Sequence, residues 1–104
     1  MRDTHEHKVC EPHELQEGRM KTVRVSGVAV LLARVAGEVL AVENRCPHEE
    51  IALYKGCLRG DQVECSLHGA RFSLRTGEVL RGPALQGIAV YAVREDDNGV
   101  YVAV

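Results

Sequence analysis

Two short segments of the chain each combine a cysteine with a histidine. One residue separates Cys46 from His48, two residues separate Cys65 from His68, and residues 49–64 lie between the two segments. Thiolate sulfur suits iron–sulfur clusters, zinc and copper(I), while imidazole nitrogen suits zinc, copper and iron. The four side chains therefore predict a metal centre, but their types alone do not identify the metal.

The distribution of the ligand types favours one kind of centre. Zinc fingers take two thiolates from one segment and two imidazoles from the other, whereas here each segment offers one of each. This mixture suits a two-iron cluster, because two thiolates can bind one iron and two imidazoles the other. A non-redox, zinc-binding interaction module stays as the alternative.

The residues around these segments predict an all-β chain. Short runs rich in branched residues are separated by turn signals such as Ser26-Gly27, Ala36-Gly37 and Arg75-Thr76-Gly77, a pattern typical of antiparallel hairpins. No stretch keeps a helical period over three turns. The expected strands are 9–10, 20–25, 28–33, 38–43, 62–64, 71–74, 78–80, 88–94 and 100–104.

The length of 104 residues predicts a single domain. The stretch from about residue 44 to 83 interrupts the strand pattern. We therefore expect a base of about 9–43 and 84–104 that carries an inserted subdomain of about 44–83. The strands before and after the insert would then have to pair. Met1 to Lys8 is expected to be a loose polar leader.

Composition and charge narrow the function classes. The net charge is −2 and no basic stripe occurs, which excludes a general nucleic-acid-binding surface. The longest apolar run, Val28 to Ala33, is too short to cross a bilayer. The polar leader lacks the pattern of a signal peptide. We therefore expect a cytoplasmic protein that does not bind a membrane.

Four cysteines occur, at positions 10, 46, 57 and 65. In a cytosolic chain this set predicts a metal site with spare thiols sooner than two disulfides. Cys10 is expected to be a small buried hydrophobe, and Cys57 a partly buried thiol. Tyr54, near the first segment, is expected to pack rather than to relay electrons.

The sequence also follows a known pattern outside the two segments. The matching stretches are Leu40 to Asn44 before the first segment, Gly56 to Asp61, Gly69 to Phe72, Arg75 to Val79, and Val100 to Val102. Over about residues 9–104 the chain resembles the Rieske iron–sulfur family. The resemblance implies a Rieske-type fold, with an antiparallel β-sandwich or barrel-like base and a small inserted β subdomain. It also implies one [2Fe-2S] cluster, bound by Cys46, His48, Cys65 and His68.

Four positions indicate which kind of Rieske protein the chain resembles. High-potential Rieske proteins of quinol-oxidising complexes carry a disulfide at the positions of Ile51 and Leu67. They also carry serine and tyrosine donors at the positions of Ala70 and Phe72. Each missing hydrogen-bond donor leaves negative charge less stabilised, which lowers the potential. We expect a potential near about −150 mV, the low end of the Rieske range.

The resemblance implies a soluble, monomeric ferredoxin rather than an enzyme. Such a protein takes single electrons from an NAD(P)H-dependent flavoprotein reductase and passes them to a terminal oxygenase that hydroxylates aromatic rings. One alternative is the small Rieske subunit of an assimilatory nitrite reductase, although some of those subunits lack the ligands that this chain keeps. The other alternative is the ferredoxin of a di-iron aromatic monooxygenase.

By the same resemblance, electrons would leave through the exposed edges of His48 and His68. The rim against which partners dock would consist of Pro47, Glu49, Leu67 and Pro83. Glu49, Glu50 and Arg71 are expected either to tune the charge of that surface or to be ordinary solvated charges.

Overall fold

The computed structural model describes residues 5–47, 51–66, 69–82 and 86–104, which form three antiparallel sheets. The first sheet has the order β1 (Glu6–Cys10), β11 (Gly99–Ala103), β10 (Val93–Asp96). The second has the order β2 (Met20–Val25), β3 (Val28–Val35), β4 (Glu38–Glu43), β9 (Val90–Tyr91). The third has the order β5 (Cys57–Arg59), β6 (Gln62–Glu64), β7 (Arg71–Ser73), β8 (Val79–Arg81). The prediction of an all-β fold is confirmed.

Helical structure in the described part of the chain is limited to two short 3-10 turns. They are η1 (Pro12–Glu14) and η2 (Leu53–Lys55). Within the described ranges, no helix is long and apolar enough to span a bilayer.

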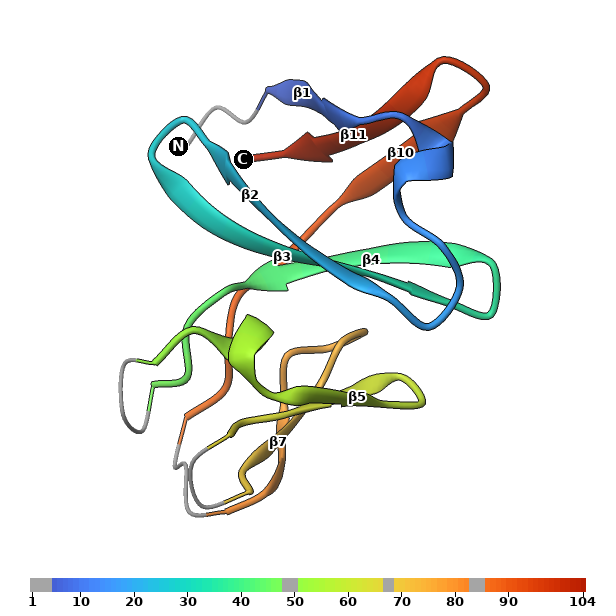
Figure 1. Cartoon of the computed structure of the whole chain (residues 1–104). Coiled ribbons are helices and arrows are strands. Elements are labelled where there is room, and N and C mark those ends of the chain that lie inside the picture. The colour runs from blue at the N-terminus through green and yellow to red at the C-terminus, as the bar shows by residue number, and fades with distance from the viewer. Residues whose placement is uncertain (1–4, 48–50, 67–68, 83–85) are drawn as a thin grey trace.

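The second sheet is the middle layer of the molecule, with the first sheet on one side and the third on the other (Figure 1). The reason lies in β3, whose central residues are completely buried on both faces. Val30 and Leu32 face the first sheet, while Leu31 and Ala33 face the third. Successive side chains of a strand point to opposite faces, so one continuous apolar run supplies both contacts.

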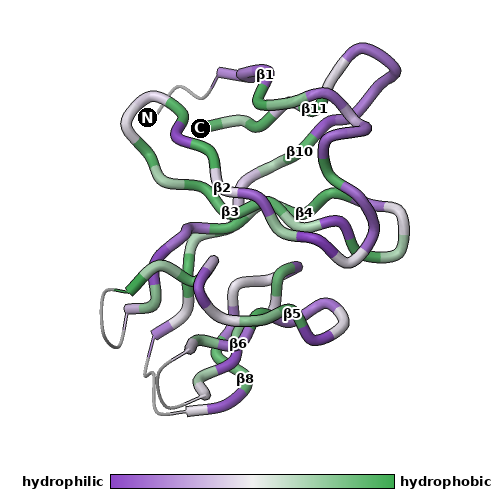
Figure 2. Tube along the Cα trace, in the orientation of Figure 1, coloured by the Kyte–Doolittle hydropathy of each residue, from purple (hydrophilic) through white to green (hydrophobic). Residues whose placement is uncertain are grey.

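Two separate cores result from this layering. The first core lies between the first and second sheets and contains Cys10, Leu15, Val25, Val30, Leu32, Val39, Ala41, Val100 and Val102. The second core lies between the second and third sheets and contains Leu31, Ala33, Val42, Cys46, Leu53, Val63, Cys65, Ala70, Phe72, Leu74 and Ile88. In Figure 2 the hydrophobic stretches line these contacts, while the tip of the β10–β11 hairpin is hydrophilic. The two predicted metal-binding cysteines belong to the second core.

Two hairpins with two-residue loops confirm predicted turns. Val25 pairs with Val28 across Ser26-Gly27, and Val35 pairs with Glu38 across Ala36-Gly37. All four turn residues have positive φ, from 49° to 81°. Two-residue loops of this kind match the twist of the flanking strands, which fixes the register of the middle sheet.

The prediction that residues up to Lys8 form a loose leader is wrong from Glu6 onward. Glu6 to Cys10 form a strand because β11 offers an edge to it, with Glu6 opposite Ala103 and Cys10 opposite Val100. Alternation brings Cys10 into the first core, where it is 6% exposed. Pairing with a distant strand has overridden the weak local preference of a polar segment.

The expected strand 88–94 is two strands in different sheets. Val90 and Tyr91 pair with β4, and then Val93 to Asp96 pair with β11. The strands before and after the insert therefore do pair, through β4 and β9, as expected. Sequence periodicity could not reveal the crossing, because both halves are extended and similar in composition. The short strand β5 was also not predicted.

Candidate functional site

The two cysteines predicted to bind metal begin two loops of matching construction. The backbone N–H of Cys46 donates to the carbonyl oxygen of Ile51 at 2.7 Å, and the N–H of Cys65 donates to that of Ala70, also at 2.7 Å. Each bond closes a loop between residue i and residue i+5. Each loop contains one of the predicted histidine ligands. His48 and His68 themselves lie outside the described residues, as do Glu49, Glu50, Leu67 and Pro83.

Both cysteines are buried at the edge of the second core. Cys46 is 0% and Cys65 2% exposed, and neither forms a disulfide. Leu53, Val63 and Phe72 are completely buried in the same core. The two thiols therefore pack against an apolar set of side chains. Among the described residues no three metal-binding side chains come together, because two of the four predicted ligands lie outside that set.

The turn η2 links the two loops. At its start, the backbone N–H of Tyr54 donates to the Asn44 side-chain oxygen at 3.0 Å, two residues before Cys46. At its end, Gly56 lies against the second loop so closely that an added Cβ would be 1.8 Å from the carbonyl oxygen of Glu64. Gly56 has an ordinary φ of −86°, so close approach rather than backbone conformation requires glycine there. The sequence analysis identified Gly56 only as the first residue of a stretch that matches the Rieske pattern.

Glu64, directly before Cys65, joins two arginines on the outer face of the third sheet. Its Oε1 accepts from Arg59 Nε at 2.7 Å and from Arg71 Nε at 2.8 Å. Arg71 and, after it, Arg59 hold the pKa of the Glu64 carboxyl below its usual value. Arg71, expected to tune docking charge or to be solvated, is therefore part of an ion-pair network.

The positions that distinguish Rieske subtypes are apolar wherever the structure describes them. Ala70 and Phe72 are completely buried, and Ile51 is partly buried against the second core. Phe72 and Cys46 belong to the same packed set of side chains. Alanine and phenylalanine carry no side-chain hydrogen-bond donor, so neither side chain can donate to a nearby sulfur.

Two expectations for residues near the site need correction. Cys57 is exposed rather than partly buried, because it lies on the outer face of β5, opposite Glu64. Tyr54 is 46% exposed, so only part of the residue packs. In contrast, the expectation that Cys10 is buried is confirmed.

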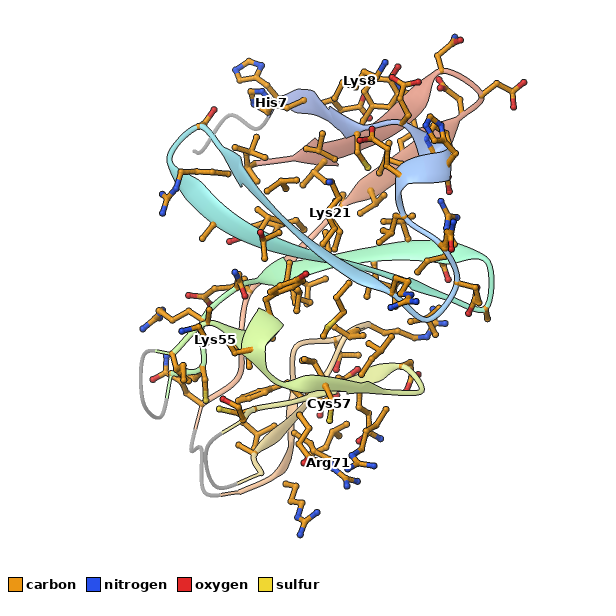
Figure 3. All side chains as sticks on the ribbon, in the orientation of Figure 1. His7, Lys8, Lys21, Lys55, Cys57 and Arg71 are labelled. Carbon is orange, nitrogen blue, oxygen red and sulfur yellow. The ribbon has the colours of Figure 1, made fainter. Side chains whose placement is uncertain are left out.

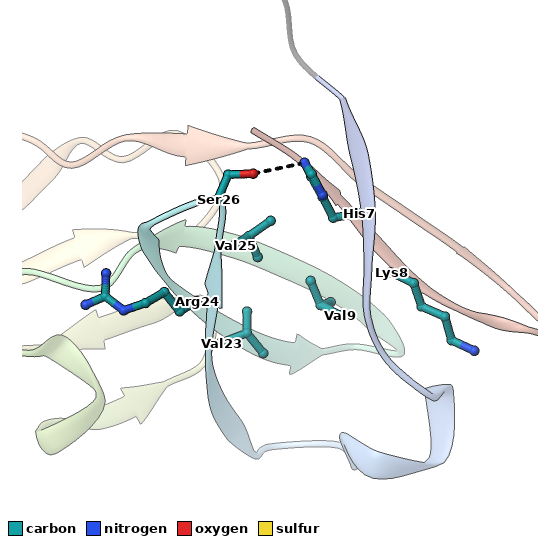
Figure 4. Close-up of a pocket in the computed structure, with 7 residues that line it drawn as sticks. All are labelled: His7, Lys8, Val9, Val23, Arg24, Val25 and Ser26. Carbon is teal, nitrogen blue, oxygen red and sulfur yellow. Dashed lines mark hydrogen bonds between the residues drawn. The ribbon is translucent and has the colours of Figure 1, made fainter.

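A separate hollow lies between β1 and β2, away from both loops. His7, Lys8 and Val9 line one side and Val23 to Ser26 line the other, with 3.5 Å between Ser26 Oγ and His7 Nε2 (Figure 4). None of its lining residues comes from the third sheet or from either cysteine loop. It is therefore not part of the predicted metal site.

Comparison with known protein families decides between the possible centres. Residues 5–92 match the model of the Rieske [2Fe-2S] domain. The chain belongs to the Rieske [2Fe-2S] family. Its cofactor is one [2Fe-2S] cluster, and the two buried thiols on paired loops fit that group.

Relatives of this Rieske protein include components of dioxygenase systems. The ferredoxin component of the naphthalene 1,2-dioxygenase system of Pseudomonas aeruginosa is 36% identical over 90 residues, which is 86% of each chain. Human apoptosis-inducing factor 3 is 35% identical over 100 residues, but the present chain spans only 16% of its length.

Solved structures of related proteins have the same fold as this chain. The carbazole 1,9a-dioxygenase ferredoxin of Nocardioides aromaticivorans IC177 has a TM-score of 0.88 at 29% identity, covering 93% of this chain and 95% of that one. A chain from a complex of oxygenase and ferredoxin in carbazole 1,9a-dioxygenase has a TM-score of 0.87 at 33% identity, covering 94% and 92%. The Rieske-type fold is thereby established for this chain.

Proposed function

We propose that this Rieske protein is a ferredoxin that carries single electrons to a terminal aromatic-ring-hydroxylating oxygenase. The observation that carries the proposal is its similarity, over 86% of both chains, to the ferredoxin component of a naphthalene dioxygenase system. The solved complex between oxygenase and ferredoxin in carbazole 1,9a-dioxygenase supports direct docking on an oxygenase. The chain would be an electron carrier and not itself an enzyme.

The proposed cluster ligands are Cys46, His48, Cys65 and His68. Support comes from the two buried thiols and from the matching bonds that close their loops. The cluster, when bound, accepts and releases one electron. The backbone bonds of Cys46 and Cys65 close the two loops, and both thiols pack in one core with Phe72 and Leu53. Electrons would cross at His48 and His68, with Pro47, Glu49, Leu67 and Pro83 as the docking rim.

We assign different tasks to the two parts of the chain. The residues from about 44 to 83 would form the cluster-binding subdomain, since both cysteine loops and all of the third sheet fall in this range. The residues of about 9–43 and 84–104 would form the base. The second core contains Leu31 and Val42 of the base together with both cysteines. The cluster-binding subdomain would therefore pack directly against the base.

The expected potential is low for a Rieske centre, near about −150 mV. The buried side chains of Ala70 and Phe72 support this value because they supply no hydrogen bond to the cluster or its thiolates. A low potential suits a carrier that receives electrons from a flavoprotein and delivers them to an oxygenase.

The other parts of the proposal concern partners and location. The electron donor would be an NAD(P)H-dependent flavoprotein reductase, and the protein would act as a monomer in the cytoplasm. Two assignments compete with this one. The protein would be the ferredoxin of a di-iron aromatic monooxygenase, or the small Rieske subunit of an assimilatory nitrite reductase. They differ in the final acceptor, so transfer to purified components separates them.

The test has two stages. In the first, iron, acid-labile sulfide and the EPR spectrum are measured for Cys46→Ser and His48→Gln, with Cys57→Ser and His13→Gln as matched controls. Loss of the cluster only in the first pair supports the ligand assignment, and equal iron in all four contradicts it.

In the second stage, the wild-type protein is added to purified reductase, NADH and the terminal oxygenase of a naphthalene or carbazole system. Hydroxylated product that forms only when the ferredoxin is present supports the proposal. Rapid reduction by the reductase without product formation, together with electron transfer to a di-iron hydroxylase or a nitrite reductase, would contradict it.

A further inference from the structure

The outer face of the third sheet carries an excess of positive charge. Its inner face consists of Leu58, Val63 and Phe72, which pack into the second core. In β5, β6 and β7, alternation then directs the charged residues Arg59, Glu64 and Arg71 outward. In β8, an irregularity in the β7–β8 register brings the exposed Arg81 opposite Arg71. The face has three guanidinium groups for one carboxylate, although the chain as a whole has a net charge of −2.

The register places these groups side by side across the sheet. Glu64 lies opposite Arg71 in the β6–β7 pair, and Arg71 lies opposite Arg81 in the β7–β8 pair. Arg59 reaches Glu64 from β5. Figure 3 shows Arg71 on the side of the third sheet that faces away from the second sheet. The four residues therefore form one continuous charged surface, here called the arginine face.

The arginine face has unused hydrogen-bonding capacity. Arg59 and Arg71 contact the Glu64 carboxylate through Nε, and the Arg59 guanidinium also interacts with Cys57. Arg81 is exposed and has no acceptor among the described residues. A guanidinium that is held by its Nε still presents its two Nη groups, which suit a carboxylate. The guanidinium groups of Arg71 and Arg81 are therefore the ones best able to engage an added carboxylate.

Arg71 and Arg81 are also an unfavourable pair by themselves. Like charges directly opposite each other on neighbouring strands destabilise a sheet. A carboxylate bound from outside would turn this repulsion into attraction. A strand surface of this kind is broad and flat, so it suits the surface of a protein better than a small anion.

We propose that the arginine face docks an acidic patch of the protein that exchanges electrons with this ferredoxin. The inference rests on the proposed function, and it concerns a surface outside the predicted histidine rim. Glu64 immediately precedes Cys65, and Arg71 immediately follows Ala70, whose carbonyl closes the Cys65 loop. A partner bound to this face is thus held beside the second cysteine loop. Long-range attraction would raise the rate of productive encounter.

The decisive variant is Arg81→Glu, because it separates docking from folding. The new carboxylate would lie opposite Arg71 and relieve the repulsion, so thermal stability should stay equal or rise. The matched control is Arg24→Glu, which makes the same change of charge at an exposed residue of β2, in a different sheet. Both variants are prepared with the cluster bound.

Two measurements test the proposal. Stopped-flow rates of electron transfer from the reductase and to the oxygenase are recorded at several ionic strengths. Arg81→Glu should lower at least one second-order rate constant at low salt by about threefold or more and weaken its salt dependence, with a smaller effect of Arg24→Glu. The affinity for poly-L-glutamate is measured by calorimetry. Arg81→Glu should weaken this binding more than Arg24→Glu does.

The outcomes are distinguishable from those that test the electron-carrier role. If the wild-type protein transfers electrons but Arg81→Glu behaves like Arg24→Glu, the arginine face is not the docking surface. A faster rate for Arg81→Glu would likewise overturn the inference. If the wild type transfers no electrons to any partner, the carrier role fails. Poly-L-glutamate binding then decides separately whether the face recognises acidic chains.

Discussion

The backbone amide of Cys65 donates a 2.7 Å hydrogen bond to the carbonyl oxygen of Ala70. The first loop repeats this relationship between Cys46 and Ile51 at the same distance. One main-chain bond closes each loop, and cluster ligands inside each loop would supply the remaining constraint. The local stability of the site should therefore depend on the metal.

Removal of iron with a chelator should loosen the third sheet more than the first. The second core contains both cysteines, whereas the first core contains Val30, Leu32 and Val102 and no predicted ligand. Hydrogen exchange of the holo and apo proteins is the appropriate measurement. We expect amides of residues 57–81 to lose protection and those of β1 and β11 to keep it. Equal loss in both regions would contradict this division.

Gly56→Ala should weaken the site. The added Cβ would meet the carbonyl oxygen of Glu64 at 1.8 Å and the backbone nitrogen of Ser66 at 3.2 Å. Backbone on both sides of Cys65 would then have to move, at an expected cost of about 1–3 kcal/mol. The control is Gly82→Ala, where an added Cβ has no neighbour within 4 Å. Thermal unfolding and iron content should fall for the first variant and stay near wild type for the second.

Phe72→Tyr should raise the reduction potential. Phe72 is completely buried in the core that contains Cys46, and a hydroxyl that reaches the cysteine sulfur would stabilise added negative charge. A rise on the order of 60 mV corresponds to a tenfold change for a one-electron couple. Phe72→Leu, which adds no donor, is the control. Voltammetry that gives the same potential for both variants would count against the missing-donor explanation.

Arg34→Lys should destabilise the base without altering the potential. The guanidinium donates to the carbonyl of Leu15 at 2.6 Å, to that of Gly37 at 2.9 Å and to that of Pro12 at 3.2 Å. It also makes a two-point contact with Glu95, at 2.7 and 3.1 Å. Lysine cannot reproduce this fork, so a loss of about 2 kcal/mol is expected in urea unfolding. Arg24 is exposed and donates to the carbonyl oxygen of Gly27, so the control Arg24→Lys should be nearly neutral.

The two cysteines outside the predicted ligand set should differ sharply toward thiol reagents. Cys57 is exposed, whereas Cys10 is buried, and burial raises the pKa of the Cys10 thiol, with a further contribution from Glu14. At neutral pH a raised pKa leaves less of the reactive thiolate. Mass spectrometry of the native holo protein should find rapid labelling of Cys57 and slow labelling of Cys10. Rapid labelling that persists in Cys57→Ser would show that another thiol is accessible.

Local chemistry in the sequence was enough to predict the family and much of the fold. The spacing of Cys46, His48, Cys65 and His68, together with the surrounding residues, indicated a Rieske centre. The hairpins at Ser26-Gly27 and Ala36-Gly37 were predictable because both turns need only two residues with positive φ. The buried position of Cys10 followed from its small, apolar character.

The tertiary structure decided what depends on contacts between distant segments. Glu6 to Cys10 form a strand only because β11 presents an edge, and residues 88–94 divide between two sheets because the chain crosses from one layer to the next. The exposure of Cys57 and the shared role of Glu64 with two arginines follow from the register of β5, β6 and β7. A single sequence carries ligand types and local turns, because these depend on neighbouring residues. Which face of a short strand meets a core, and which charges meet across a sheet, is fixed only when the strands pair.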